Sequence, residues 1–389
     1  MNFALTHEQR MLVRTIKEFI KAELQPHENE IEETGILNHE KALEIQQKSI
    51  KLGLYALNVP KSFGGAGLST LDWIIAEEQF GHTTDILVRR AFGNIYDLLF
   101  KGTPEQVERW LLPSVKGNRV FSIAFSEPEA GSDASAIRTM AERNSSGWTI
   151  NGKKHFISDG NFSDFFIITA KTNLNAGNRG ISTFIIDKQS PGLQVGRDQP
   201  MMGLRGTSHV ELFFDNVKLG LESLLGKEGD GFKLALETLG RIRLGQIGAR
   251  AIGKATRILD LSSDYARKRN QFGENIDQFQ MIQQMLADSA IEINSSRLAL
   301  YQTAWGIDQG MDSRARISMV KIQSSETLCR VADRAVQIYG GLGYCKDLPI
   351  ERYFRDSRIF RIYDGTSEIH RTLVARAISD GNQNLYNFF

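Results

Sequence analysis

Residues 229–269 read GDGFKLALETLGRIRLGQIGARAIGKATRILDLSSDYARKR, and they decide the fold because the hydrophobic period changes where they begin. Apolar residues recur at helical spacing along this whole block. The preceding segment VELFFDNVKL, at 210–219, is instead rich in aromatic and β-branched residues, which is typical of a strand. The change predicts a boundary between a β region and a helical region near residue 225.

The sequence on either side of this boundary repeats the contrast. Short strand-like segments punctuated by Gly, Asn, Asp and Pro precede it, and they indicate a small antiparallel β domain. They are VFSIAFS (120–126), GWTINGKKHFIS (147–158), DFFIITAKT (164–172), STFIIDK (182–188) and LQVGR (193–197). Two more long helical blocks follow it, at 277–308 and 316–340. Long helices joined by short loops are typical of an antiparallel bundle.

The N-terminal region also has a helical period. In LTHEQRMLVRTIKEFIKAEL (5–24), Thr6 and Gln9 match a capping box at the start of a helix. We therefore predict an α+β fold that is mostly α. It comprises an N-terminal α-helical domain (1–118), a middle antiparallel β domain (119–225) and a C-terminal four-helix bundle (226–389).

Composition narrows the possible partners. The chain has 389 residues, of which 47 are basic and 46 acidic, with no long run of either sign. This balance predicts no nucleic-acid and no membrane partner, and no apolar run is long enough to span a bilayer. The seven histidines and two cysteines show no metal-ligand spacing, so no metal site is expected. Cys329 and Cys345 form no disulfide framework, which favours a reducing, cytoplasmic location.

Four loops are candidates for chemistry, and each has an ordinary structural alternative. FSEPEAGSD (125–133) is either a β-turn or a cradle of amide donors, and RKRNQFG (267–273) is a charged helix end or a pyrophosphate site. AVQIYGGLGY (335–344) is a glycine helix cap or a point of close approach. RIYDGTSEIHR (361–371) is a capping turn unless Asp364 has a chemical role. No G-x-G-x-x-G follows a strand and no G-x-S-x-G occurs, so a Rossmann site and a nucleophile elbow are not expected.

Six features in their order along the chain resemble the acyl-CoA dehydrogenase family of flavoproteins. They are a helical N-terminal region, FSEPEAGSD, GKKHFIS (152–158), RNQFGENIDQFQMIQ (269–283), VQIYGGLGY (336–344) and IYDGTSEIHR (362–371). The resemblance covers essentially the whole chain. It implies FAD as cofactor, an acyl thioester as substrate and a homotetramer built as a dimer of dimers. An electron-transferring flavoprotein is the implied acceptor, and lipid metabolism the implied setting.

The resemblance also assigns residues to the cofactor. Two groups are expected at the flavin ring of their own subunit, and a third reaches the FAD of the neighbouring subunit. At the ring stand Phe125, Ser126, Gly131, Ser132, Phe156 and Ser158. Thr366 and Glu368 follow the base and touch the same flavin. The neighbour's FAD is reached by Arg269, Gln271, Phe272, Gln337 and Gly341.

Asp364 stands where most relatives carry a glutamate, the base that removes the α-proton of the thioester while the β-hydride passes to flavin N5. An aspartate keeps the carboxylate but reaches roughly 1.5 Å less, and offsets near 1 Å can cost about a hundredfold in rate. Some relatives place the base on the helix before Arg241, where this chain has Gly240. Asp364 is therefore the expected base.

Substrate contacts are expected from Ser132, Thr238, Arg241 and Arg89. Thr238 replaces an aspartate that contacts CoA in many relatives. Arg89 and Arg90 are expected at the far end of the acyl pocket, where they would suit a polar or anionic acyl end, unless they form a solvated helix face or a subunit contact. Three functions stay open: an acyl-CoA dehydrogenase, a dehydrogenase of acyl groups on a carrier protein, and a flavin-binding scaffold whose Asp364 is too short.

Overall fold

The computed structural model describes residues 4–386, and its N-terminal third is helical. The first helix begins at the predicted capping box, because Thr6 Oγ1 accepts a hydrogen bond from the Gln9 amide at 3.2 Å and Gln9 Oε1 accepts one from the Thr6 amide at 2.9 Å. The helices are α1 (His7–Phe19), α2 (Glu28–Thr34), α3 (His39–Lys51), α4 (Thr70–Phe80), α5 (Asp85–Phe92), α6 (Pro104–Gln106) and α7 (Leu112–Val115).

Helix α4 lies at the centre of the molecule. All residues from Trp73 to Phe80 are buried, including two glutamates and a glutamine, and the helix packs against α1, α9 and α10. Gly81, at its end, has no room for a side chain, since a Cβ would lie 2.3 Å from the carbonyl oxygen of Arg250. The helix therefore brings charged side chains into the interior.

The middle of the chain forms the predicted β domain. Its strands are β1 (Phe121–Ala124), β2 (Met140–Asn144), β3 (Gly147–Ser158), β4 (Phe165–Lys171), β5 (Ile181–Asp187), β6 (Leu193–Asp198), β7 (His209–Gly220) and β8 (Leu224–Leu225). They pair in the order β6-β7-β3-β2-β4-β5-β8, with β1 beside β4. The pairing is antiparallel except between β1 and β4 and at the single β2–β4 bridge.

Both faces of the sheet are covered, which explains why β4 and β5 are almost wholly apolar. One face packs its own aromatic and aliphatic side chains around Trp148 and Phe166. The other face, with Phe165 and Ile167, packs against Trp110 and the rest of the N-terminal helices. The element type changes between α7 and β1 and between β8 and the next helix, and we keep 118 and 225 as the proposed domain limits.

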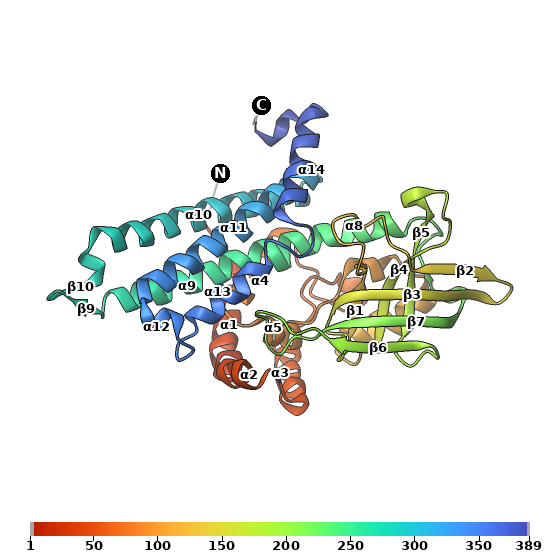
Figure 1. Ribbon diagram of the computed structural model, residues 1–389, viewed down its shortest axis with the longest axis horizontal. Coiled ribbons are helices and arrows are strands. Elements are labelled where there is room, and N and C mark those ends of the chain that lie inside the picture. The colour runs from red at the N-terminus through yellow and green to blue at the C-terminus, as the bar shows by residue number, and fades with distance from the viewer. Residues whose placement is uncertain (1–3, 387–389) are drawn as a thin grey trace.

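The C-terminal part is a helical bundle with a hairpin at its tip (Figure 1). Its elements are α8 (Gly231–Ile242), α9 (Arg250–Ala266), β9 (Asn270–Gln271), β10 (Glu274–Asn275), α10 (Gln280–Asp308), α11 (Arg314–Tyr339), α12 (Gly341–Tyr344), α13 (Ile350–Ile359) and α14 (Ser367–Ser379). A π-helical segment, Arg243–Ala249, joins α8 to α9, and α8 extends from the bundle to the β domain (Figure 1). Within residues 4–386, no helix combines the length and apolar character that a bilayer span requires.

Candidate active site

Asp364 lies in the turn between α13 and α14 and has a left-handed backbone, with φ of 54°, followed by Gly365 at 99°. Aspartate is one of the few residues besides glycine that adopt this region readily. Helix α14 begins directly afterwards, because Thr366 Oγ1 accepts a hydrogen bond from the Ile369 amide at 3.3 Å. Thr366 is thus the N-cap within the predicted capping turn, and Asp364 lies just before it.

Two side chains hold the backbone of Asp364. Arg243 Nε donates to its carbonyl oxygen at 2.7 Å, and His370 Nε2 lies 3.2 Å from the same atom. Burial lowers the pKa of His370 to about 4, so its ring is neutral near pH 7. Nε2 therefore donates, while Nδ1 accepts from the Ser318 hydroxyl at 3.0 Å. A Cβ on Gly365 would lie 2.8 Å from His370 Nε2, so this turn requires glycine.

The carboxylate of Asp364 has a different environment from its backbone carbonyl group. Burial raises its pKa, while the positive charges of Arg243, Lys321 and Arg89 act in the opposite direction. Among residues 4–386, no ion pair and no hydrogen bond involves its carboxylate oxygens. The side chain is therefore a half-buried carboxylate that remains available to a ligand.

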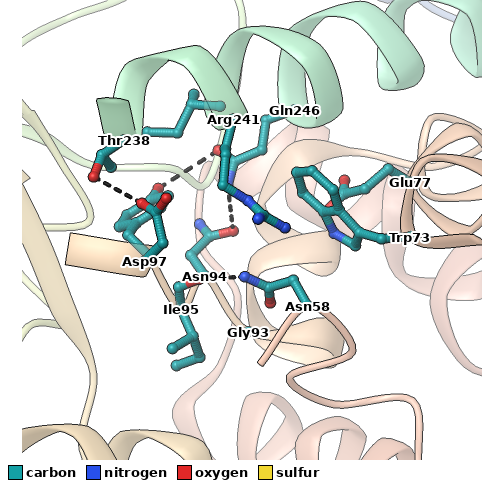
Figure 2. Close-up of a pocket in the computed structure, with 12 residues that line it drawn as sticks. Asn58, Trp73, Glu77, Gly93, Asn94, Ile95, Asp97, Thr238, Arg241 and Gln246 are labelled. Carbon is teal, nitrogen blue, oxygen red and sulfur yellow. Dashed lines mark hydrogen bonds between the residues drawn. The ribbon is translucent and has the colours of Figure 1, made fainter. Parts of the chain in front are cut away.

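A cavity lies between α4, α8 and the loop after α5 (Figure 2). Asp364 is connected to the cavity wall through Arg243, which directly follows the lining residue Ile242 and donates to the Asp364 carbonyl oxygen. The lining residues are Asn58, Trp73, Glu77, Gly93, Asn94, Ile95, Tyr96, Asp97, Thr238, Arg241, Ile242 and Gln246.

Two of the predicted substrate residues line this cavity. Thr238 is buried, and its hydroxyl donates to Asp97 Oδ1 at 2.8 Å (Figure 2). The Arg241 guanidinium lies over the ring of Trp73, 5.0 Å from its centre. Arg241 therefore borders the cavity, whereas Arg243, which sequence reasoning did not select, is the arginine that contacts Asp364.

A cluster of charged side chains, the buried charge cluster, lies in the interior next to the cavity. We define it as Glu77, Asp85, Arg89, Arg90, Asp159 and Arg250. Arg250 Nε donates to Glu77 Oε2 at 2.6 Å, and its Nη1 lies 3.4 Å from Asp85 Oδ1. Asp85 also accepts a hydrogen bond from Arg89. The cluster joins α4, α5, the end of β3 and α9, so all three regions of the chain meet here.

The alternative that Arg89 and Arg90 form a solvated helix face is wrong. The Arg89 side chain is 11% exposed and the Arg90 side chain 8% exposed, and both approach Asp159, at 3.4 Å and 2.8 Å. Arg90 also stacks on the Phe162 ring at 4.5 Å. Across the cluster, three arginines face three carboxylates, so no cation is left unbalanced.

The loop FSEPEAGSD follows β1 and is fixed at its base by residues that sequence reasoning missed. Glu127 is buried, and its carboxylate accepts from the Lys154 ammonium at 2.8 Å and from the Arg138 amide at 2.6 Å. Gly131 and Ser132 are exposed, and a Cβ at Gly131 would meet nothing within 4 Å. Phe125 is half-buried against the core. The tip of this loop is thus open to a ligand on a rigid support.

Phe156 is placed beside this loop. The His155 amide donates to the carbonyl oxygen of Ser126 at 2.9 Å, and the rings of His155 and Phe156 stack at 3.9 Å. Phe156 has φ of 59°, lies at a shift in the β3–β7 register and is 54% exposed. Ser158 lies two residues on at the end of β3. An exposed aromatic ring held at a bulge, with small polar residues around it, fits a planar flavin ring.

The residues expected to reach a neighbouring subunit lie elsewhere. Arg269, Gln271 and Phe272 are in the β9–β10 hairpin, at the opposite end of the molecule from the β domain (Figure 1). Gln337 and Gly341 are exposed at the end of α11, and the hairpin packs against this end through Ile276 and Ile338. Phe272 is 96% exposed. Within one chain these five residues therefore lie at the hairpin end of the bundle, whereas Phe156 lies in the β domain. Glu368 is exposed on α14.

Comparisons with known proteins cover the same regions. Models of the N-terminal, middle and C-terminal domains of acyl-CoA dehydrogenase match residues 6–118, 122–217 and 229–379. Acryloyl-CoA reductase (NADH) of Anaerotignum propionicum is 38% identical over 385 residues, which are 97% of this chain and 96% of that protein. Subunit CarC of the caffeyl-CoA reductase-Etf complex of Acetobacterium woodii is 35% identical over 95% of this chain and 98% of its own length.

A solved structure agrees over the same length. Butyryl-CoA dehydrogenase from Megasphaera elsdenii superposes with a TM-score of 0.90 and 32% identity, covering 97% of this chain and all of that one. The three domain matches, the full-length identity and the shared fold lead to one assignment. The chain belongs to the acyl-CoA dehydrogenase family of FAD-dependent oxidoreductases, which act on the Cα–Cβ bond of acyl-CoA thioesters.

Proposed function

We propose that Asp364 is the base that takes the α-proton of an acyl-CoA thioester bound in the cavity of Figure 2. The observation that carries this role is the half-buried carboxylate, which has a raised pKa and no ion pair within residues 4–386, on the turn that Arg243 links to the cavity wall. An α-proton next to a thioester is weakly acidic, so the base must have more proton affinity than an aspartate in water. Asp364 has that property.

The flavin side is proposed as follows. Phe156 and Ser158, with Phe125, Ser126, Gly131 and Ser132 of the loop, hold the ring, and Thr366 and Glu368 touch it from α14. FAD, when bound, supplies the acceptor for the β-hydride. The proton then resides on Asp364, and the double bond lies between Cα and Cβ. In the reverse direction, Asp364 returns the proton to Cα, which is the chemistry that the name acryloyl-CoA reductase describes for one relative.

The substrate is proposed to be a short acyl group. A long aliphatic chain would have to extend into the buried charge cluster and displace its ion pairs, which is costly. The balance of charges also means that Arg89 offers no free cation to an anionic acyl end. Arg241 and Ser132 are proposed to contact the CoA and thioester portions.

The assembly is proposed to be a dimer of dimers. Support comes from the exposed hairpin with Phe272, Arg269 and Gln271 and from exposed Gln337 and Gly341, which are remote from Phe156 in the same chain. Each FAD would then contact two subunits. Light scattering of the holoprotein should give four chains, and a flavin-saturated monomer would contradict this arrangement.

The electron partner is proposed to be an electron-transferring flavoprotein, since one relative is named as a subunit of an Etf complex. A cytoplasmic location and a role in lipid metabolism complete the proposal, and the free thiols of Cys329 and Cys345 agree with a reducing compartment.

Carrier-protein thioesters are the second candidate substrate, because Thr238 is occupied by Asp97 instead of facing a CoA ligand freely. Anaerobic mixing separates the candidates. Short acyl-CoA esters should bleach the flavin, whereas bleaching by pantetheine thioesters on a carrier protein alone would select the second candidate. Bleaching by neither would leave a flavin-binding scaffold. Straight, branched and dicarboxylic acyl-CoA esters in the same panel test the proposed short, uncharged acyl group.

A further inference from the structure

Lys321 lies on α11 and is fully buried, with 0% exposure. Its ammonium has no hydrogen-bond partner within residues 4–386. Ser318, one turn earlier on the same helix, contacts His370, which in turn contacts the backbone of Asp364. Lys321 therefore belongs to the part of α11 that supports the turn of Asp364.

The other fully buried lysines are satisfied. Lys154 donates to the Glu127 carboxylate at 2.8 Å, and Lys254 donates to the carbonyl oxygen of Thr83 at 3.0 Å. Burying an ammonium without a partner destabilises a folded protein, and packing alone would be served better by a methionine. The unpaired state of Lys321 therefore needs an explanation other than stability.

The charges around Lys321 come from four elements. The cation of Arg243 lies on the π-helical segment, where its Nε is occupied by the Asp364 carbonyl oxygen. Lys321 also lies close enough to Asp364 for each charge to change the pKa of the other. The groups facing Lys321 are Asp364 in the turn, Arg243 on the π-helical segment, Glu368 and neutral His370 on α14, and Glu326 on its own helix.

We propose that Lys321 is a positioning residue for the base, whose buried ammonium favours the ionised form of Asp364 from a distance, without an ion pair that would block the carboxylate. The inference rests on the proposed role of Asp364. A direct ion pair would lower the proton affinity of the base, and the loss of the neighbouring cation would raise its pKa further. A nearby but unbonded ammonium gives an intermediate state, in which Asp364 is charged and still free to accept a proton.

The test is the pH profile of flavin reduction in the FAD holoenzyme. The probe is the acyl-CoA of the panel that reduces the wild-type flavin fastest. In Lys321→Met the acidic limb of the profile should move upward by about one pH unit, because a neighbouring positive charge is lost. The rate on the plateau should rise by less than about tenfold, since a base whose pKa is one unit higher is stronger by no more than that factor. Lys321→Arg should restore the wild-type limb, and Lys254→Met is the matched control that should leave it in place.

Thermal unfolding separates this role from a structural one. Burial lowers the pKa of Lys321 from 10.5 to about 8, so the unfolded chain binds more protons between these values and wild-type stability should rise from pH 8 to pH 10.5. At pH 7 the buried charge opposes folding, and Lys321→Met should melt at or above the wild-type temperature. A lower melting temperature with a uniformly reduced rate would show a structural role and overturn the proposal.

Asp364→Asn is measured alongside, so that two failures are distinguished. If Asp364→Asn is inactive and the Lys321→Met profile superimposes on that of wild type, Lys321 has no positioning role and the base assignment stands. If the flavin of Asp364→Asn is reduced at the normal rate, the base assignment is wrong, and the proposed role of Lys321 is then wrong as well.

Discussion

Asp364 and Asp85 are two half-buried aspartates, yet the pKa of Asp364 is raised and the pKa of Asp85 is lowered. Burial acts to raise the pKa of both. At Asp85, Arg89 and Arg250 more than offset burial and hold the pKa at about 2. At Asp364 burial prevails, because its cations act from a distance.

The difference shows how one residue type forms a fixed ion in one place and the proposed base in another. An aspartate locked between two arginines has little affinity for a proton and serves to hold α5 against α9. The unpaired aspartate has higher proton affinity and a free lone pair. The arginine that Asp85 binds directly, Arg89, acts on Asp364 only through space. Four experiments test this contrast.

The largest effect is expected from Asp85→Asn. The substitution leaves Arg89 and Arg250 buried with one carboxylate fewer, which should lower the free energy of unfolding by about 3 kcal/mol. Urea unfolding followed by circular dichroism measures it, with Asp380→Asn, at an exposed site, as control. A loss similar to that of the control would mean that the cluster contributes little to stability.

Asp364→Asn should affect the reaction instead. It keeps the size of the side chain but removes the proton acceptor, so flavin reduction by the best acyl-CoA should fall about a hundredfold. FAD content and the circular dichroism spectrum should match wild type. Stopped-flow absorbance under anaerobic conditions gives the rate, and near-normal reduction would return Asp364 to the role of a turn residue.

The pH dependence of stability should have opposite signs at the two sites. Asp85, with its pKa lowered from 3.8 to about 2, contributes about 2 kcal/mol that is present above pH 4 and lost as the pH falls through 2. Asp364, with a raised pKa, binds its proton more tightly in the folded state, so stability falls as the pH rises above 3.8. Melting curves of both asparagine variants from pH 3 to pH 8 should diverge from wild type in opposite directions. Parallel curves would contradict the contrast.

Asp364→Glu should have the smallest of the four effects. Glutamate is less tolerant of the left-handed backbone at φ of 54°, which should cost about 1 kcal/mol of stability. The longer side chain should also crowd the substrate and slow flavin reduction. An increase in rate would instead show that the short reach of aspartate limits the enzyme.

Sequence reasoning anticipated elements that depend on local pattern. The capping box of Thr6 and Gln9, the capping turn within residues 361–371 and the sequence of helical, β and helical regions all depend on neighbours within a few positions. The resemblance placed Arg241 at the CoA portion of the substrate, and Arg241 lines the cavity, but Arg243, which contacts Asp364, was not selected. Helical spacing assumes 3.6 residues per turn, and the π-helical segment that begins at Arg243 changes which residues face inward.

Contacts between distant residues could not be read from the pattern. Ser318 and His370 are separated by 52 positions, and Glu127 and Lys154 by 27. Arg89 and Arg90 look like surface charges because the carboxylate that both approach, Asp159, lies in another region of the chain. The only signal was the number of charged residues in helices that are otherwise apolar, which indicates partners without naming them.

The buried charge cluster also has a consequence during synthesis on the ribosome. Glu77 is translated 173 residues before Arg250, its closest partner, so the N-terminal helices emerge with a carboxylate that must remain in water. Such a segment cannot bury its interior until the first bundle helices have left the exit tunnel. We therefore expect nascent chains that end before Arg250 to stay protease-sensitive and to engage chaperones, and the N-terminal region to complete folding only together with the bundle.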